Sequence, residues 1–452
     1  MKPLKGKQKI EEQKFASSLT KFTFFSFYDS MNFIKRSTLL FIVFCFSINS
    51  YGSYLLIQMD DSQKNHLKAY GISFWVLKQN VEVEWLLNYR GGSFLIKHLQ
   101  PIENECVIRG VSYEIIANAQ AIGIKQEISN PEVNMDVVKL EKPPKIAVYS
   151  PKNKLPWDDA VTLVLTYAEI PYDVVYDEEI INGQLPLYDW LHLHHEDFTG
   201  QYGKFYAMYK NAAWYREQVR TSEEMAAKLG FEKVSELKLA VAQSIRNFTA
   251  GGGFLFTMCS GTDSYDIALA ADGVDICENI YDHDGVDPQA QQKLDFNTTF
   301  AFKDFQLKKN PLEYEYSSID ADKLHKRTPE ELDYFTLFDF SAKWDPVPTM
   351  LCQNHTPVVK GFFGQTTAFH KQYIKPEVII MGETKSLNTA KYIHGTFGKG
   401  QWTFYAGHDP ADYKHYVNDP KTDLNLHPNS AGYRLILNNI LFPAAKKKKQ
   451  KT

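Results

Sequence analysis

The stretch that most constrains the fold runs from Gly251 to Ser264, because it reads as a strand, a tight turn and a helix in succession. Three glycines lead into the apolar run Phe254–Met258, and Tyr265–Ala270 then continues as a helix. Cys259 lies at the turn. In open α/β sheets, ligands bind at the carboxyl ends of strands, and the N-terminus of the following helix offers unpaired N–H groups. The stretch therefore predicts an α/β fold with a candidate nucleophile at Cys259.

Strand and helix patterns alternate elsewhere in the chain as well. A strand at 145–149, a helix at 157–169 and a strand at 172–176 follow one another through short connections. Such a unit favours a parallel sheet with a right-handed crossover. Residues 54–94 show the same order of elements, which indicates either a weak internal repeat or two similar units that arose by chance. We predict a three-layer α/β/α fold with a mostly parallel, flavodoxin-like sheet.

The domain limits are predicted from breaks in this pattern. The adjacent Pro143 and Pro144 mark the best linker in the chain. They separate an N-terminal α/β segment, 53–142, from a core, 143–445, and the core carries a β-rich insertion at about 275–375. The basic residues 446–452 are expected to form a solvated tail.

The N-terminal region resembles an export signal. Lys35 and Arg36 precede an apolar run at 39–48, and small residues follow at Ser50 and Gly52. This order is typical of a secretory signal cleaved near Gly52, and the run is too short to span a membrane. We expect a periplasmic or secreted protein with no membrane span in its mature form. An uncleaved signal that anchors the protein to the membrane is the alternative.

The residues before Met31 read as an upstream extension, so the sequence leaves the true start open between Met1 and Met31.

The overall charge argues against one class of partner. The formal net charge is -4, and the lysines gather as a block only in the tail. Proteins that bind nucleic acid through phosphate contacts carry a basic surface, so we expect no nucleic acid partner.

Four cysteines would remain after signal cleavage: Cys106, Cys259, Cys277 and Cys352. Their wide and irregular spacing is not that of a disulfide framework, and we interpret them as buried free thiols. The absence of a Cys-x-x-Cys pair in the sequence excludes a structural zinc knuckle.

Cys259 is the first candidate for chemistry. Nucleophilic catalysis by a thiol needs a base within hydrogen-bond reach and a third group that orients the base. His408 follows a late predicted strand and is the candidate base, with Asp409 and Asp412 beside it as candidate orienting groups. The N–H groups after Cys259 would then serve as an oxyanion site. The alternative is that Cys259 is a small buried apolar residue.

A histidine cluster forms the second candidate site. His192 and His194 alternate along a predicted strand and so share a face, and His195, Glu196 and Asp197 follow them. We expect this segment to line the same cleft as Cys259. Our prediction is that no cofactor is bound, and a divalent metal held by His192, His194 and Glu196 is the alternative.

An acidic loop is the third candidate. Asp282, Asp284 and Asp287 have the oxygen density of a calcium loop, but the loop lacks the glutamate that closes an EF-hand. We interpret it as an ordinary polar turn.

Two glycine-led stretches carry a resemblance to a known fold. Gly253–Cys259 followed by a helix, together with Gly400–Pro410 and a terminal helix, resembles the class I glutamine amidotransferase fold, and the trehalose-utilisation-like branch is the most similar. The resemblance covers roughly 145–443. Cys259-Ser260-Gly261 matches the second half of the family's nucleophile motif, and Thr257 stands where the family has a glycine. The resemblance implies a cysteine nucleophile at the elbow.

A second resemblance concerns the same residues. Cys259–Ser264 is similar to the pyrophosphate loop of asparagine synthetases at Gly261, Asp263 and Ser264. Over its mature length, the chain also resembles a family of exported bacterial proteins labelled asparagine synthetase B. The segments that carry this likeness are His66–Gly71, Trp85–Ser93 and Leu424–Ser430. The label implies an enzyme that depends on ATP and glutamine.

Three functions therefore stay open. The first is a cysteine-dependent amide hydrolase or amidotransferase, the second a non-catalytic binding protein that reuses the fold, and the third an asparagine synthetase. We expect a small-molecule, saccharide or peptide ligand. Aromatic side chains at Phe198, Tyr202, Phe205 and Tyr206 would either stack on it or pack in the core. The candidate substrate-binding residues are Ser260, Gly261, Asp263, His194, His195 and Glu196.

Overall fold

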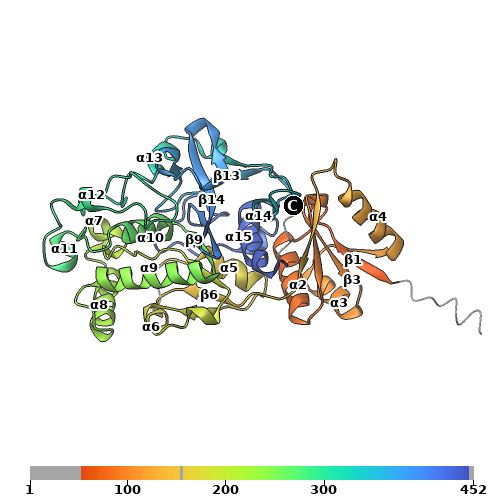
Figure 1. Ribbon diagram of the computed structural model, residues 1–452, viewed down its shortest axis with the longest axis horizontal. Coiled ribbons are helices and arrows are strands. Elements are labelled where there is room, and N and C mark those ends of the chain that lie inside the picture. The colour runs from red at the N-terminus through yellow and green to blue at the C-terminus, as the bar shows by residue number, and fades with distance from the viewer. Residues whose placement is uncertain (1–51, 153–155, 447–452) are drawn as a thin grey trace, which may run out of the picture. The chain divides into compact units, whose positions relative to one another are not determined.

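The computed structural model describes residues 52–152 and 156–446, and these residues build two β-sheets with their helices (Figure 1). The predicted signal run at 39–48 and the end of the basic tail, 447–452, lie outside the described residues. Within the described ranges, no helix is both long and apolar enough to cross a membrane.

The first sheet uses the N-terminal part of the chain and is antiparallel throughout. Its strands run in the order β4-β1-β3-β2-β5. They are β1 (Ser53–Ile57), β2 (Val83–Leu87), β3 (Ser93–Lys97), β4 (Glu114–Ala117) and β5 (Asp136–Leu140), with the helices α2 (His66–Lys78), α3 (Gln100–Arg109) and α4 (Asn118–Ser129).

The prediction that residues 54–94 form a parallel strand–helix–strand unit, like the one at 145–176, is wrong. β1 and β2 are not neighbours, because β3 lies between them and pairs antiparallel with both. The cause is local. Asn88 and Arg90 have φ of 61° and 45°, and Gly91 and Gly92 also have positive φ. This left-handed backbone turns the chain from β2 straight back into β3.

The second sheet is larger and carries the candidate site. Its path is β11-β10-β13-β14-β15-β9-β8-β6-β7, and β12 pairs with β14. Its strands are β6 (Ile146–Tyr149), β7 (Asp173–Val175), β8 (Trp190–Leu193), β9 (Phe254–Met258), β10 (Tyr334–Leu337), β11 (Val358–Lys360), β12 (Phe369–His370), β13 (Ile379–Thr384), β14 (Thr389–Phe397) and β15 (Gly400–Tyr405).

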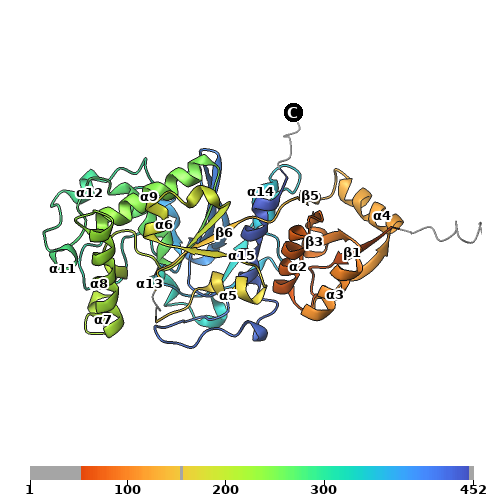
Figure 2. The same cartoon turned by 90° about the horizontal axis from the view of Figure 1, so that it is seen from below.

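Helices cover both faces of this sheet (Figures 1 and 2). α5 (Ala160–Tyr167) and α15 (Ala431–Leu441) pack in one apolar cluster with Phe256 and Met258 of β9. α6 (Asp177–Ile181), α9 (Val234–Gly251) and α10 (Ser260–Ala270) pack in another with Leu255 of the same strand. Alternate residues of a strand point to opposite faces. The predicted α/β class and three-layer arrangement are confirmed.

The parallel strands of the second sheet are β7, β6, β8, β9 and β15. The remaining strands pair antiparallel, and β10, β11 and β12 of this part fall inside the predicted β-rich insertion. The other helices of this part are α7 (Tyr206–Tyr209), α8 (Ala213–Lys228), α11 (Asn279–Asp282), α12 (Ala290–Lys293), α13 (Asp322–His325) and α14 (Pro346–Leu351).

The order of the parallel strands creates a switch point. From β6 the chain moves to β7 on one side and then returns to β8 on the other. The loops that follow β6 and β8 therefore diverge, and such a point is where open α/β sheets bind their ligands. The loops that follow β9 and β15 begin at the same edge of the sheet, because these strands are parallel to β8 and lie next to it in the strand order.

A buried polar cluster joins α2 to α15. The Arg434 guanidinium is fully buried and donates hydrogen bonds to the Met59 and Gly91 carbonyls and to the Tyr70 hydroxyl. His66 contacts the Met59 carbonyl through Nε2 and the Asn429 Oδ1 through Nδ1, each at 3.0 Å. These polar groups are therefore paired within the protein.

Candidate functional site

Cys259 lies at a strained turn between β9 and α10. Its φ is 51° and its ψ is -138°, a conformation that is rare for a residue with a side chain and that costs on the order of 1–3 kcal/mol. A strand-to-helix turn of this kind is the arrangement in which α/β enzymes present a nucleophile. The Ser260 N–H acts on the Cys259 sulfur. The N–H groups of Gly261 and Thr262 instead donate to the His194 and Cys259 carbonyls, so these two do not form the predicted oxyanion site.

The turn is fixed to the end of β8 by one main-chain hydrogen bond. The Gly261 N–H donates to the His194 carbonyl at 2.7 Å. A Cβ atom on residue 261 would lie 2.7 Å from the same oxygen, so a side chain at this position would force the two segments apart. This explains why Gly261 is needed beside Cys259.

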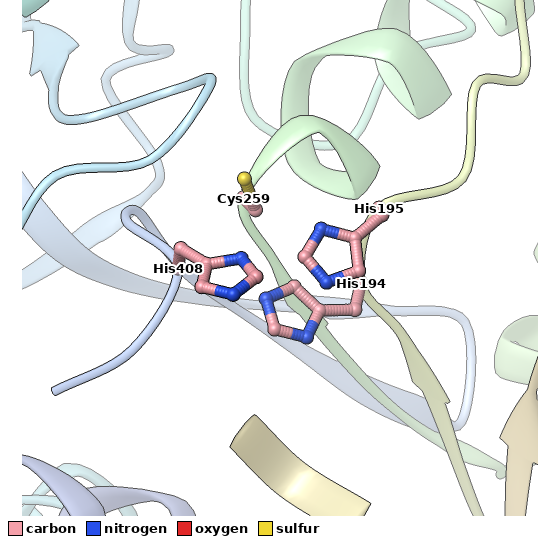
Figure 3. A group of neighbouring side chains, drawn as sticks. All are labelled: His194, His195, Cys259 and His408. Carbon is pink, nitrogen blue, oxygen red and sulfur yellow. The ribbon is translucent and has the colours of Figure 1, made fainter. Parts of the chain in front are cut away.

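Three histidines meet the thiol at the carboxyl edge of the sheet (Figure 3). His194 and His195 follow β8, and His408 follows β15. One ring nitrogen of each and the Cys259 sulfur all lie within 4.8 Å of one another. The rings of His194 and His195 are stacked with centroids 3.7 Å apart, and the His195 ring lies 4.4 Å from the His408 ring.

Two aspartates of the loop between β6 and α5 face these histidines. Asp159 Oδ2 lies 3.1 Å from His192 Nε2 and 3.3 Å from His194 Nδ1. Asp158 Oδ1 lies 2.8 Å from His415 Nε2 and 3.7 Å from His408 Nε2. Burial opposes the charge of both carboxylates, yet the hydrogen bonds and charges of their histidine neighbours outweigh it and lower both pKa values.

The histidines nearest Cys259 are held neutral. Burial lowers the pKa of His194 to about 4 and that of His195 well below its usual value, and it also lowers the pKa of His408. Neutral imidazoles are the form that accepts a proton or binds a metal ion. Either chemistry is therefore open to this cluster near pH 7.

The thiol itself is protonated and covered. Burial raises the pKa of Cys259 to about 11, although backbone N–H groups of Gln365, Thr366 and Ser260 act in the opposite direction. The Gln365 N–H lies 3.2 Å from the sulfur, and the Cys259 residue is only 2% exposed. Deprotonation of the thiol in this state needs a base or a cation.

The segment that covers the sulfur is tied down at several points. The Gln365 side chain donates to the Gly203 carbonyl at 2.7 Å, and the Thr366 hydroxyl donates to Asp263 at 2.8 Å. The Lys391 ammonium donates to the Phe362 carbonyl and, at 2.6 Å, to the Thr367 carbonyl. The cover is thus an ordered part of the protein.

A pocket of about 230 Å³ opens beside the histidines. Its walls include Asp158, Asp159, His194, His195 and Glu196, and Trp157 forms one side. A second pocket of about 220 Å³ shares Trp157, His195 and Glu196. Burial raises the pKa of Glu196 to about 7. The histidine side of the site is therefore the side that a ligand reaches.

The predicted orienting acids lie elsewhere. Asp409 accepts hydrogen bonds from the Ala411 N–H and the Thr422 hydroxyl, and Asp412 pairs with His415 at 2.9 Å. The carboxylate nearest His408 is Asp158 instead. The predicted Cys259, His408, His194 and His195 do come together, and Glu196 lines the adjoining pocket.

Three predicted residues of the elbow are buried inside α10. Ser260, Gly261 and Asp263 belong to its first turn and are not exposed. Asp263 accepts the Thr366 hydroxyl, and burial raises the pKa of its carboxyl to about 7. Their proposed contact with a substrate or a nucleotide stays a prediction.

The acidic loop is neutralised by a lysine. The Lys233 ammonium contacts Asp275 at 2.7 Å, Asp282 at 3.0 Å and Asp284 at 2.7 Å. A cation already occupies the space between these carboxylates, which supports their interpretation as a structural turn. The four described cysteines are all free, as predicted.

Sequence reasoning missed Asp158, Asp159, His415 and the cover at Gln365. A signal was present for the aspartates, because they lie in the loop between the first strand of the parallel part and its helix. No pattern pointed to His415 or Gln365, which reach the site through irregular loops.

The comparisons with known proteins give no family. No family model and no curated protein matches the chain. Two cytoplasmic proteins of Salmonella typhimurium have similar structures, with TM-scores of 0.32, 10% and 13% identity, and coverage of 67% of this chain and 100% of theirs. A catalytic mutant of a GH42 beta-galactosidase from G. stearothermophilus matches with a TM-score of 0.24, 12% identity, and coverage of 59% of this chain and 28% of its own.

Proposed function

We propose that the protein is an exported, cysteine-dependent hydrolase or amidotransferase that acts on an amide of a small molecule or peptide. The observation that carries the proposal is the left-handed backbone of Cys259, which sets the sulfur within 4.8 Å of the ring nitrogens of three histidines. Export is part of the proposal and rests on the apolar run at 39–48.

The reaction assigns a role to each group. One neutral imidazole, for which His408 is the candidate, accepts the Cys259 proton as the sulfur attacks the amide carbonyl carbon. The C–N bond then breaks, and the amine leaves with the proton that the imidazolium returns. Water attacks the resulting thioester, releases a carboxylic acid and restores the thiol.

The electrostatics support the proton transfer. Asp158, whose pKa is lowered, lies 3.7 Å from His408 and would stabilise the imidazolium that forms. The backbone N–H of Gln365 points at the sulfur at 3.2 Å and would stabilise negative charge there. A substrate would enter from the pocket beside His194 and His195 and displace part of the cover.

The test uses metal-free protein and a panel of amides that includes glutamine and fluorogenic aryl amides. We expect turnover that Cys259→Ala removes and Cys277→Ala retains, because Cys277 is a buried thiol outside the site that donates to the Thr199 carbonyl. Mass spectrometry of quenched reactions should find the acyl group on Cys259. Equal turnover in both variants would contradict the proposal.

A non-catalytic binding protein is the second candidate. It is favoured by the 2% exposure of Cys259 and by its thiol pKa of about 11. This candidate predicts ligand binding at the pocket without turnover of any amide in the panel, and without a difference between Cys259→Ala and the parent protein. Isothermal titration with the same panel separates the two candidates.

A further inference from the structure

The buried histidines at the end of β8 are oriented as metal ligands are. His195 Nε2 lies 2.8 Å from the Asp158 carbonyl oxygen. A carbonyl only accepts hydrogen bonds, so Nε2 carries the proton and Nδ1 keeps a free lone pair. His194 turns Nδ1 toward Asp159 at 3.3 Å, which leaves its Nε2 free. An acceptor behind the ring is the usual partner of a metal-binding histidine.

Unpaired polar atoms lie at the same place. Among the described residues of this cluster, His194 Nε2 and Asp158 Oδ2 are buried without a hydrogen bond or an ion-pair partner, whereas His194 Nδ1, Asp158 Oδ1, His408 Nε2 and His415 Nε2 lie 2.8–3.7 Å from a carboxylate or imidazole of the cluster. Buried polar groups without a partner are rare in folded proteins, because each costs about 1–3 kcal/mol. The free His194 Nε2 is therefore available to a ligand.

The donor set and its spacing fit one class of ligand. We infer that His194, His195, His408 and Cys259 form a binding site for Zn²⁺ or a similar borderline transition-metal ion. Three imidazoles and a thiolate suit this class, whereas Ca²⁺ and Mg²⁺ prefer oxygen. With metal–ligand bonds of about 2.0–2.3 Å, the donor atoms of a tetrahedral site lie about 3.3–3.8 Å apart. The present donors, all within 4.8 Å, need only small movements.

The site has an entry path and a means of releasing a proton. His194 and His195 line the pocket of about 230 Å³, which brings the outside of the protein next to the two rings, although the His194 ring nitrogens themselves are buried. On binding, the Cys259 S–H bond breaks, the proton leaves to solvent, and the thiolate electron pair forms the bond to the metal. No oxidation state changes.

The metal site differs from the set predicted from the sequence. His192 uses both ring nitrogens, because Nδ1 lies 3.2 Å from the Phe256 carbonyl and Nε2 lies 3.1 Å from Asp159. The His192 ring therefore holds the Asp159 carboxylate in place, and the same carboxylate lies 3.3 Å from His194 Nδ1. Glu196 is no member of the group of donor atoms around Cys259.

One consequence rests on the proposed function. A thiolate bound to a metal ion does not attack an amide carbonyl, so the ion and the substrate compete for Cys259. Zinc would then be a reversible inhibitor of the hydrolase, and its removal would activate the enzyme.

The binding test uses the full mature chain after treatment with a chelator, and Co²⁺ as the probe. We expect one equivalent of Co²⁺ with visible d–d bands and a near-ultraviolet band from thiolate-to-metal charge transfer. Cys259→Ser should abolish the charge-transfer band and weaken binding at least tenfold, and His195→Gln should weaken binding at least tenfold. Zn²⁺ should displace the probe.

Two matched controls come from the same chain. Cys277→Ser removes another buried thiol, and His325→Gln removes another buried histidine whose two nitrogens are paired with Asp333 and Thr389. Both should bind Co²⁺ like the parent. A parent protein that binds less than a fifth of an equivalent, or equal binding in the site and control variants, would overturn the inference.

A measurement on the parent protein alone guards against misfolded variants. Iodoacetamide in mild urea should alkylate Cys259 at least tenfold more slowly when Zn²⁺ is present, and Cys352 at an unchanged rate. Equal rates at Cys259 with and without Zn²⁺ would count against the site. Turnover by metal-free protein without Co²⁺ binding would support the proposed function and refute the metal site. Co²⁺ binding without turnover would support the metal site and refute the proposed function.

Discussion

The molecule contains two buried polar clusters, one around Arg434 and one around Cys259, that differ in whether their polar atoms have hydrogen-bond partners within the protein. Around Arg434, the guanidinium and the two nitrogens of His66 meet carbonyl, amide and hydroxyl oxygens of the protein itself. Around Cys259, His194 Nε2 lies buried without such a partner. Burial alone therefore does not identify a functional site. A cluster whose polar groups are paired stabilises the fold, and one whose groups are unpaired is ready for a ligand.

The largest expected effect is at the paired cluster. Arg434→Met keeps most of the side-chain volume but leaves the Gly91 carbonyl without the guanidinium and the Met59 carbonyl with only the His66 ring. We expect the free energy of unfolding to fall by about 3–5 kcal/mol. Urea unfolding measures this loss. Arg220→Met is the control, since Arg220 forms exposed ion pairs with Glu217 and Glu224 on α8, and the substitution should leave the transition almost unchanged.

The sharpest test of the comparison makes the same substitution in both clusters. His66→Phe removes the two ring nitrogens that contact the Met59 carbonyl and Asn429 Oδ1 and should cost about 3 kcal/mol. His194→Phe removes one nitrogen without a partner and one that lies 3.3 Å from Asp159 Oδ2, so in chelator-treated protein it should cost less than His66→Phe, about 1 kcal/mol. Equal losses in denaturant unfolding would show that the two clusters do not differ.

The paired cluster also predicts a pH dependence. Burial, and then the charge of Arg434, lowers the pKa of His66 to about 4. Below about pH 6.5 the His66 imidazole takes up a proton in the unfolded chain, whereas in the folded protein it stays neutral down to about pH 4. Stability therefore rises with pH between about 4 and 6.5 and is lost as the pH falls through this window.

The part due to His66 should be on the order of 2 kcal/mol between pH 7 and pH 4. Unfolding free energies at several pH values, compared with His66→Gln, isolate it. His355, which stacks on His66 and also has a lowered pKa, acts in the same direction and remains in the variant. A slope that His66→Gln leaves unchanged would contradict this assignment.

The smallest effect concerns the strain at the elbow. With φ at 51°, Cys259 has a backbone conformation that glycine adopts at little cost. Cys259→Gly should therefore be more stable than Cys259→Ala by about 1 kcal/mol, whereas glycine normally lowers stability relative to alanine. Thermal unfolding of the two variants gives the difference. A less stable Cys259→Gly would mean that the turn stores no strain.

Local patterns predicted the parts of the site that directly follow strands. Cys259 follows β9, His194 and His195 follow β8, and His408 lies three residues beyond β15. Parallel strands bring such positions to one edge whatever their distance along the chain. The three-layer fold was predictable for the same reason, because alternating strands and helices leave few arrangements.

The rest depends on contacts between distant segments. Asp159 caps α5 through Oδ1, which accepts the Thr162 N–H at 2.9 Å, and this is the role that its sequence position indicates. Its contact with His192 through Oδ2 becomes visible only when β6 and β8 are placed side by side. The antiparallel first sheet was missed because the order of elements does not fix which strands pair. The cover at Gln365 lies in a stretch without periodicity.

The hydrogen bond from the Gly261 N–H to the His194 carbonyl has an implication for engineering. It joins the main chains that carry the thiol and the imidazoles of His194 and His195, so the spacing of these groups does not depend on any side chain of the covering segment. The side chains of Phe363 and Gln365 are then open to redesign, whereas Gly364 has to stay, because a Cβ atom there would lie 2.7 Å from the His408 main-chain nitrogen. A library of variants in this segment would change which substrates reach Cys259 and would leave the reacting residues unchanged.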